Sequence, residues 1–199
     1  GEERAQAIFG SLLKRNKASI RVTDLSRKEE IKTLLSASDS ILSNTGLVKE
    51  QGHFAGHHLF AEGAITIQDE SSQLVAPTLH LQGEEQVLDA CAAPGGKTAH
   101  IASYLTTGQV TALDLYDHKL TLIQENAERL GVADRVRTEK LDARKVHEFF
   151  GKDQFDKILV DAPCSGIGLL RRKPDIKYNK ETADFMSLQE IQLEILGSV

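Results

Sequence analysis

A short apolar run that leads into a Pro-Gly-Gly turn and then into a helical segment, at residues 87–98, constrains the fold of this chain most strongly. A second apolar run, Ile158-Leu-Val-Asp161, leads directly into Ala-Pro-Cys-Ser-Gly166. Both runs are short enough to be buried parallel strands, whose following loops meet at the carboxyl edge of the sheet. The sequence therefore predicts an α/β protein whose site combines a Gly-rich loop with the carboxylate of Asp161 and the thiol of Cys164.

From residue 67 onward, apolar runs alternate with segments of helical periodicity. We expect strands at residues 86–90, 109–114, 135–140 and 157–161, and helices at residues 97–106, 117–130, 143–150 and 182–196. One face of helix 117–130 is apolar, and Gly131 is placed to end it. Strands that alternate with helices through short loops predict a doubly wound, mostly parallel, Rossmann-like sheet.

The first 66 residues have a different pattern, which predicts a small α/β subdomain. We expect a helix at residues 3–14, a strand at 18–22, and a second helix that begins with a capping box from Ser26 to Glu29. A turn at Asn44-Thr-Gly46 separates the apolar pairs 41–42 and 47–48, which predicts two short strands. The expected organisation is a subdomain at 1–66 and a catalytic domain at 67–199.

The bulk properties narrow the class of protein. The net charge of −5 excludes an overall basic surface, so contact with nucleic acid must be local. Only two cysteines are present, and both lie beside predicted ligand loops, which favours a reducing cytoplasm over a disulfide framework. No apolar run is long enough to cross a membrane. We therefore expect a cytoplasmic, monomeric protein with no evident protein partner and no contact with a membrane.

The Gly-rich loop is compatible with two kinds of ligand. A glycine turn before a helix can receive either the carboxylate of S-adenosylmethionine (AdoMet) or a nucleotide phosphate. Gly96-Lys97-Thr98 matches the end of the phosphate-loop pattern of NTPases, but Cys91 stands where that pattern requires its first glycine. Asp114 ends the next predicted strand, at the position expected for an acid that binds ribose hydroxyls. A nucleoside cofactor is therefore favoured, and an NTPase is the lesser alternative.

A third acid, Asp142, follows the predicted strand 135–140 and could accept a hydrogen bond from an adenine amino group. A single aspartate after a strand is more often a turn or cap residue. Three acids after successive strands, beside a Gly-rich loop, favour the nucleoside interpretation. Three histidines, His53, His57 and His58, lack a matching set of ligands, so no metal site is expected.

The pair of Asp161 and Cys164 suits chemistry on a pyrimidine ring. Carbon 5 of cytosine is a poor nucleophile, and its methylation requires a thiolate to add first at carbon 6. An acid hydrogen-bonded to the base stabilises the charge that develops during this addition. A single cysteine near a strand end is more often a small buried apolar residue. The surrounding Asp-Ala-Pro-Cys-Ser-Gly sequence favours a functional role for Cys164.

Together, Asp89-Ala-Cys-Ala-Ala-Pro-Gly-Gly-Lys-Thr98, Asp161-Ala-Pro-Cys-Ser-Gly166 and Arg171-Arg-Lys-Pro-Asp-Ile-Lys177 resemble the Sun/Nop family of RNA cytosine-5 methyltransferases. Gln68-Asp-Glu-Ser-Ser-Gln73 resembles the same family, and the bacterial members that act on small-subunit ribosomal RNA are most similar. The resemblance implies that AdoMet is the cofactor and ribosomal RNA the substrate. It also implies the cofactor loop, which consists of Cys91, Ala92, Ala93, Pro94, Gly95, Gly96 and Lys97.

The resemblance further implies roles for individual residues. Asp114 would bind the ribose, Asp142 the adenine, and Asp161 would lie between cofactor and cytosine. Lys97 and Cys164 would complete the catalytic group, with Cys164 assisting product release. The family's covalent nucleophile is a different cysteine, on a later strand that these 199 residues do not include. We therefore expect a fragment whose sheet lacks its last strands. An AdoMet- and RNA-binding module, inactive by itself, is an alternative, as is Cys164 acting as the nucleophile.

Two basic clusters are candidates for contact with RNA. Beyond the Asp161 site lie four cations, Arg171, Arg172, Lys173 and Lys177. Such a cluster would contact phosphates and give salt-dependent affinity without reading sequence. The second cluster, formed by Lys14, Arg15, Lys17 and Arg21, is equally compatible with a solvated surface.

Overall fold

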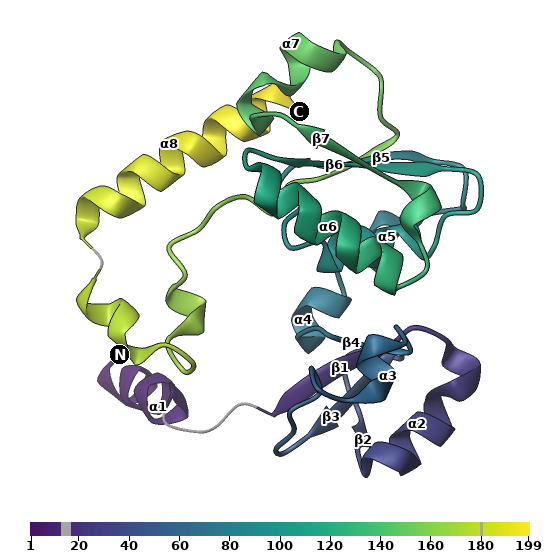
Figure 1. Cartoon of the computed structure of the whole chain (residues 1–199). Coiled ribbons are helices and arrows are strands. Elements are labelled where there is room, and N and C mark those ends of the chain that lie inside the picture. The colour runs from purple at the N-terminus through teal and green to yellow at the C-terminus, as the bar shows by residue number, and fades with distance from the viewer. Residues whose placement is uncertain (13–16, 180) are drawn as a thin grey trace.

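The computed structural model describes residues 1–12, 17–179 and 181–199, and these form two four-stranded sheets (Figure 1). The first sheet has the strand order β2-β3-β1-β4 and is antiparallel. The second has the order β7-β6-β5-β8 and is parallel. Its strands are β5 (Gln86–Asp89), β6 (Gln109–Asp114), β7 (Val136–Lys140) and β8 (Lys157–Leu159). The Rossmann-like α/β fold expected from the sequence is confirmed.

Four helices follow the strands of the parallel sheet, and their bounds are α5 (Gly96–Ala102), α6 (Asp117–Arg129), α7 (Val146–Phe150) and α8 (Thr182–Ser198). Figure 1 shows α5 and α6 together on one face of the sheet. On the opposite face lie α7 and the C-terminal end of α8. Helix α6 ends as expected, because Gly131 has a φ of 69° and its N–H donates to the carbonyl of Glu128.

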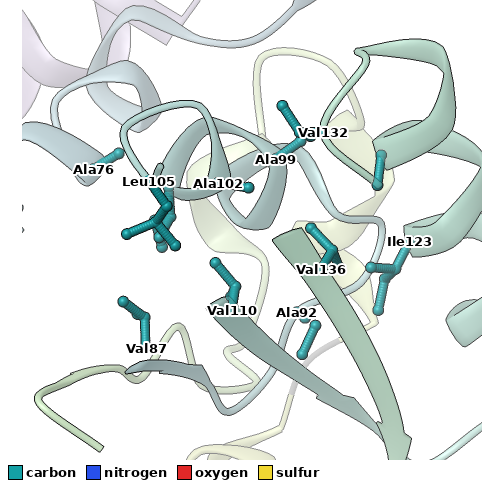
Figure 2. Close-up of a cluster of buried hydrophobic side chains, with 13 residues drawn as sticks. Ala76, Val87, Ala92, Ala99, Ala102, Leu105, Val110, Ile123, Val132 and Val136 are labelled. Atoms are coloured by element: carbon teal, nitrogen blue, oxygen red, sulfur yellow. The ribbon is translucent and has the colours of Figure 1, made fainter. Parts of the chain in front are cut away.

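The alternation of side chains along the strands explains the two layers. Val87 and Val110 point toward α5 and α6, where they pack with Ile123 in the cluster of Figure 2. Leu88, which follows Val87, and Leu113, which follows Ala112 of the same cluster, belong to a separate core beneath α7 and α8. Because successive residues of a strand face opposite sides, a strand with two apolar faces must be covered twice. The continuous apolar runs seen in the sequence have this cause.

The antiparallel sheet consists of β1 (Ala18–Val22), β2 (Ser38–Asp39), β3 (Gly46–Lys49) and β4 (Ile65–Ile67). The accompanying helices are α1 (Glu2–Leu12), α2 (Lys28–Leu35), α3 (His58–Ala61) and α4 (Glu70–Gln73). A core of its own, which includes Ile20, Ile31 and Leu47, lies under this sheet. His57 lies at the start of α3, where its Nδ1 accepts the N–H of Leu59.

Three local predictions for the N-terminal part were wrong or incomplete. The capping residue is Asp24, whose side chain accepts the N–H of Ser26 and starts a 3₁₀ turn before α2, so Ser26 and Glu29 form no capping box. The strand before the Asn44 turn is Ser38–Asp39, and Ile41 is 95% exposed in the loop. Helix α1 is described only to Leu12, and the remaining positions of the predicted helix, Leu13 and Lys14, lie outside the described residues.

Smaller differences concern the parallel sheet. The last strand ends at Leu159 rather than residue 161, and helix 97–106 ends at Ala102. The segment expected as helix 143–150 is a 3₁₀ turn at Ala143–Lys145 followed by α7. Within the described ranges, no helix has the length and apolar character to cross a membrane. Helix α8 exposes several large apolar side chains, namely Phe185, Met186, Leu193 and Leu196.

The two sheets are joined through one arginine on α6. The Arg129 guanidinium donates hydrogen bonds to the carbonyls of Phe60 and Ile65, and it lies 3.9 Å from the Phe60 ring centroid. A Cβ atom on Gly63 would lie 2.0 Å from the carbonyl oxygen of Arg129, so only glycine fits this approach. These contacts fix the antiparallel sheet against the helical layer of the parallel sheet.

Candidate functional site

A cavity of about 410 Å³ lies at the carboxyl ends of β5, β6 and β7. Its wall includes residues that follow each of these strands, among them Cys91, Asp114 and Asp142, together with Asp161 beyond β8. Its volume is in the range of small-molecule sites, and the carboxyl edge of a parallel sheet is where such sites occur. The structure thus brings together the three predicted site acids, Asp114, Asp142 and Asp161, of which the first and last are 47 residues apart in the sequence.

Asp114 ends β6 and lies at the cavity wall with its side chain only 10% exposed. One carboxylate oxygen, Oδ1, accepts the backbone N–H of Tyr116 at 3.1 Å. The Lys119 ammonium lies 3.8 Å from the same oxygen and 5.1 Å from the Tyr116 ring centroid. These contacts hold a charged acceptor at the edge of the cavity, which is the geometry that a pair of vicinal hydroxyls requires.

Asp142 has two roles in the structure. It begins the 3₁₀ turn after β7, where Oδ1 accepts the N–H of Arg144, and it also lines the cavity. The Arg144 guanidinium contacts both carboxylate oxygens and extends to Glu194 on α8. This hydrogen bonding lowers the pKa of Asp142 below its usual value. The carboxylate therefore stays ionised, with its orientation fixed by Arg144.

The Gly-rich loop is shaped by close packing against α6. Gly95 has a φ of 96°, and a Cβ atom there would lie 2.9 Å from the Cα of Ile123. A Cβ on Gly96, in contrast, would meet nothing within 4 Å, and Gly96 lines a second cavity of about 200 Å³. Gly95 is thus required by the fold, whereas Gly96 leaves room for a ligand to approach the backbone.

A buried acid lies directly beneath this loop. Asp89 is 1% exposed, and its Oδ2 accepts the hydroxyl hydrogen of Thr98 at 2.7 Å. Its Oδ1 is buried and has no hydrogen-bond partner among the residues that the structure describes. Burial raises the pKa of Asp89 to about 6, and the Thr98 hydrogen bond opposes this shift. Thr98 is fully buried, so its hydroxyl is directed at Asp89 and away from any bound ligand.

Two of the three predicted catalytic residues, Lys97 and Asp161, are in contact. The Lys97 ammonium, at the start of α5, forms a short ion pair with Oδ2 of Asp161. Asp161 lines both the 410 Å³ and the 200 Å³ cavities, which also share Cys91 and Ala93. Asp161 therefore lies at the junction of the two cavities.

The two cysteines differ in environment. Cys91 is half-buried among four acids, and its burial together with these charges raises the pKa of its thiol to about 11. It is therefore protonated at neutral pH and unsuited to nucleophilic attack. Cys164 is exposed. Its neighbour Pro163 lines the larger cavity, but Cys164 itself is absent from the walls of the cavities described here.

Of the predicted RNA-binding cations, Arg171 and Arg172 line a third cavity of about 510 Å³, whose other wall is formed by residues on and near the antiparallel sheet. Lys17, from the second basic cluster, lines the same cavity. Lys173 precedes a 3₁₀ turn at Pro174–Tyr178. That turn includes Lys177, whose side chain lies outside the described part of the structure.

Arg21, also from the second basic cluster, is buried rather than at the surface. Arg21 is 2% exposed, and its Nε donates to Gln68 at 2.8 Å. Burial lowers the pKa of Arg21 to about 10. Lys14 and Arg15 lie outside the described residues.

Several residues at the cavities were not assigned a role from the sequence. The larger cavity is also lined by Leu115, Tyr116, Lys119 and Ile191. Gln68 and Asp69 line the 200 Å³ cavity opposite Lys97. Gln68 and Asp69 belong to the Gln68–Gln73 motif, which resembles the family. Because this motif precedes the first strand of the parallel sheet, the sequence did not indicate which cavity it would line.

The charges and hydrogen bonds around the Gly-rich loop favour a cationic or nucleoside ligand over a nucleoside triphosphate. Four carboxylates surround the loop, and its one lysine is already paired with Asp161. In a phosphate loop, the threonine hydroxyl binds Mg²⁺ and the lysine contacts phosphates. Here Thr98 donates to Asp89 instead. The geometry is therefore unfavourable for the NTPase alternative.

Comparison with known proteins identifies the family. A family model described as 16S rRNA methyltransferase RsmB/F matches residues 76–199, which is more than half of the chain. The chain belongs to the RsmB/F family. Membership confirms the resemblance to bacterial methyltransferases of small-subunit ribosomal RNA, and it supports AdoMet as the cofactor of this RsmB/F-family chain.

Individual relatives agree with the family assignment. The chain is 55% identical over 150 residues to the probable ribosomal RNA small subunit methyltransferase B of Bacillus subtilis, covering 75% of this chain and 33% of that protein. A Klebsiella pneumoniae protein with the name ribosomal RNA small subunit methyltransferase B is 43% identical over 140 residues, covering 70% and 32%. The RsmB/F-family chain thus spans about a third of the length of these curated relatives.

Solved structures share the fold. The crystal structure of PH0851 superposes with a TM-score of 0.87 at 31% identity, covering 96% of this chain and 45% of that one. The structure of NSun6 from Pyrococcus horikoshii with SFG also gives a TM-score of 0.87, at 20% identity, covering 100% and 76%. The second similarity, at this identity, supports the fold alone.

Proposed function

We propose that this RsmB/F-family chain carries the cofactor-binding half of an AdoMet-dependent methyltransferase that forms 5-methylcytosine in small-subunit ribosomal RNA. The observation that carries the proposal is the position of Asp161. It lies at the junction of the two cavities and contacts Lys97. One cavity would hold the cofactor and the other the target base, so that Asp161 lies between the methyl donor and the acceptor.

The larger cavity is the proposed cofactor site. Asp114 would accept hydrogen bonds from the ribose hydroxyls, and Asp142 from the adenine amino group. The loop from Cys91 to Lys97 would surround the methionine part, which would extend from the larger cavity toward the smaller one that Gly96 lines. AdoMet supplies an electrophilic methyl group on a sulfonium. The surrounding carboxylates suit this positive charge, because opposite charges within a few ångströms stabilise each other.

The smaller cavity is the proposed site of the flipped cytosine. A base in a structured RNA must leave its stack to reach such a site. In the reaction, a thiolate adds at carbon 6 and the electron pair moves to carbon 5, which takes the methyl group. Loss of the carbon-5 proton to a base then lets the thiolate leave. Asp161 would hydrogen-bond the cytosine during the addition, with its orientation fixed by Lys97.

The two cysteines contribute differently to this mechanism. The raised pKa of Cys91 makes it a loop residue rather than a nucleophile. The exposed Cys164, two residues after Ala162 in the Asp161 loop, would assist release of the product. The nucleophile would be a cysteine of the family that these 199 residues do not contain. The basic segment of Arg171, Arg172, Lys173 and Lys177 would bind RNA phosphates.

Methyl transfer from labelled AdoMet to unmodified small-subunit ribosomal RNA tests the proposal. The 199-residue chain is assayed beside a longer protein that extends through the family's next cysteine motif, with Cys164→Ala made in both. We expect transfer by the longer protein, with the label recovered as 5-methylcytosine, and AdoMet binding without transfer by the 199 residues. Label at another atom or another base would contradict the proposed product.

A second candidate is a module that binds AdoMet and RNA without catalysis. Cys164 does not line either of the two cavities at Asp161, which favours a non-catalytic binding module when the 199 residues act alone. Transfer by the 199-residue chain that is lost in Cys164→Ala would exclude this module and make Cys164 the nucleophile.

A further inference from the structure

An ion pair joins the segment before the parallel sheet to the proposed RNA-binding segment. Nη2 of Arg172 donates a short hydrogen bond to Oδ1 of Asp69. The two residues are 103 positions apart in the sequence, and each side chain is 49% exposed. The cation that is proposed to bind phosphate is therefore already occupied by a carboxylate of the same chain.

The position of this pair connects it to the proposed path of the substrate. Asp69 and Ile67 line both the 510 Å³ cavity at the antiparallel sheet and the 200 Å³ cavity at Asp161. Arg172 lines the first of these. An RNA strand that enters through the 510 Å³ cavity and places one base beside Asp161 must pass Asp69. The ion pair thus lies where the two cavities meet.

The local structure around Asp69 does not account for the direction of its side chain. Asp69 is the residue before α4, a position where aspartate commonly accepts a backbone N–H of the first turn. Its side chain makes no such bond here. The segment itself is held by other residues. Gln73 is buried and donates to the backbone carbonyl of Gln68, and the side-chain amide oxygen of Gln68 accepts from Nε of Arg21. Asp69 is therefore not needed to anchor the segment.

We propose that Asp69 is a specificity-determining residue that competes with RNA phosphate for Arg172 at the passage between the two cavities. The proposal rests on the proposed function. An RNA phosphate that binds Arg172 must displace the Asp69 carboxylate. The displaced carboxylate then remains beside the RNA, where its negative charge repels the phosphates. The free-energy cost of breaking the Asp69–Arg172 ion pair applies to every polyanion. Only an RNA strand that also places a base in the cavity at Asp161 makes contacts that offset this cost. Asp69 thereby lowers the affinity for unspecific RNA.

The test measures binding of a fluorescein-labelled single-stranded oligoribonucleotide to the 199-residue chain by anisotropy at low salt. Four proteins form a double-mutant cycle: wild type, Asp69→Asn, Arg172→Ala and the double variant. We expect Asp69→Asn to bind about two- to fivefold more tightly, as an exposed ion pair of this kind permits. The gain is expected to shrink as salt rises and to disappear in the Arg172→Ala background.

Glu50→Gln is the matched control, because Glu50 lines the same cavity but pairs with Lys17. It removes the same charge without releasing Arg172, so a gain equal to that of Asp69→Asn would overturn the proposal. Weaker binding by Asp69→Asn would also overturn it, since Asp69 would then position Arg172 for RNA. AdoMet affinity, measured in parallel, reports that each variant is folded.

The two proposals fail in different ways. If Arg172→Ala weakens RNA binding but Asp69→Asn does not tighten it, the competition by Asp69 is wrong and the RNA-binding segment stands. If Arg172→Ala leaves RNA binding unchanged in a chain that binds AdoMet, the role of Arg172 in RNA binding is wrong, and the proposal for Asp69 fails with it.

Discussion

The hydroxyl of Thr98 donates a 2.7 Å hydrogen bond to the buried carboxylate of Asp89. This contact joins the strand before the Gly-rich loop to the helix after it, so that the loop is closed at its base. It also makes the Gly-Lys-Thr sequence here unfavourable as a phosphate site. The threonine hydroxyl satisfies a buried acid, and the lysine next to it pairs with Asp161.

Replacing Thr98 by valine, which has a similar shape, should destabilise the chain. The substitution leaves Asp89 without the one side-chain donor that its Oδ2 has, and an unsatisfied buried acceptor costs about 1–3 kcal/mol. The loss should be larger at pH 7.5 than at pH 5, where Asp89 is partly protonated. Urea unfolding measures it, with Thr111→Val, another buried threonine in β6, as the control. Equal losses in the two variants would contradict the account.

The raised pKa of Asp89 predicts a pH-dependent stability. The pKa of about 6 in the folded chain lies above the ordinary aspartate pKa of 3.8, so the folded chain binds this proton more tightly than the unfolded chain. The stability that the protonated acid contributes is complete below pH 4 and lost as pH rises through 6. Asp89→Asn should therefore gain stability relative to wild type across this interval, by about 3 kcal/mol.

The comparison is made by urea unfolding at a series of pH values from 4 to 8. Asp117→Asn is the control, because Asp117 is exposed and its pKa is lowered by Lys140. If the free energies of unfolding of Asp89→Asn and wild type differ by the same amount at every pH, Asp89 does not titrate in this interval.

The two thiols should react at very different rates. With a pKa of about 11, Cys91 has roughly one thiolate in a thousand molecules at pH 8, and it is half-buried. Cys164 is exposed. Iodoacetamide should therefore label Cys164 first, as peptide mass spectrometry would show, and Cys164→Ala should remove the fast phase. Fast labelling of Cys91 in that variant would contradict the proposed environment of the loop.

Gly63→Ala tests the junction between the two sheets. The added Cβ would lie 2.0 Å from the carbonyl oxygen of Arg129, and the φ of 74° is strained for any other residue. We expect a loss of at least about 2 kcal/mol in the free energy of unfolding. Gly10→Ala is the control, because a Cβ there meets nothing within 4 Å. A loss no larger than that of the control would mean that the sheets do not approach as described.

The parallel sheet was predictable because its signals are local and repeated. Strands β5 and β6 are largely apolar runs with both faces buried, and the segment after each of the four strands carries a glycine or an acid. Val87 and Leu88 show the pattern, since they lie in two different cores on opposite faces of β5. The acids Asp114, Asp142 and Asp161 meet at one cavity because parallel strands end at one edge.

The remaining features depend on contacts between distant segments. Arg21 had the sequence signature of a surface cation, yet it is buried beside Gln68. Nothing local to Asp69 indicates its pairing with Arg172, which only the packing of the two sheets brings about. The hairpin near Asn44 was misplaced because Ile41 and Leu42 are apolar but lie in an exposed loop, while the polar Ser38–Asp39 pair with β3.

Calorimetric titration of AdoMet into the 199-residue chain tests the cofactor assignment most directly. The account predicts binding of AdoMet, no binding of Mg-ATP, and an affinity reduced about tenfold or more in Asp114→Asn, because a hydrogen bond to a charged acceptor is lost. Asp117→Asn, three residues away and outside the cavity, should bind as wild type does. Binding of Mg-ATP without AdoMet, or equal affinities of the two variants, would contradict the account.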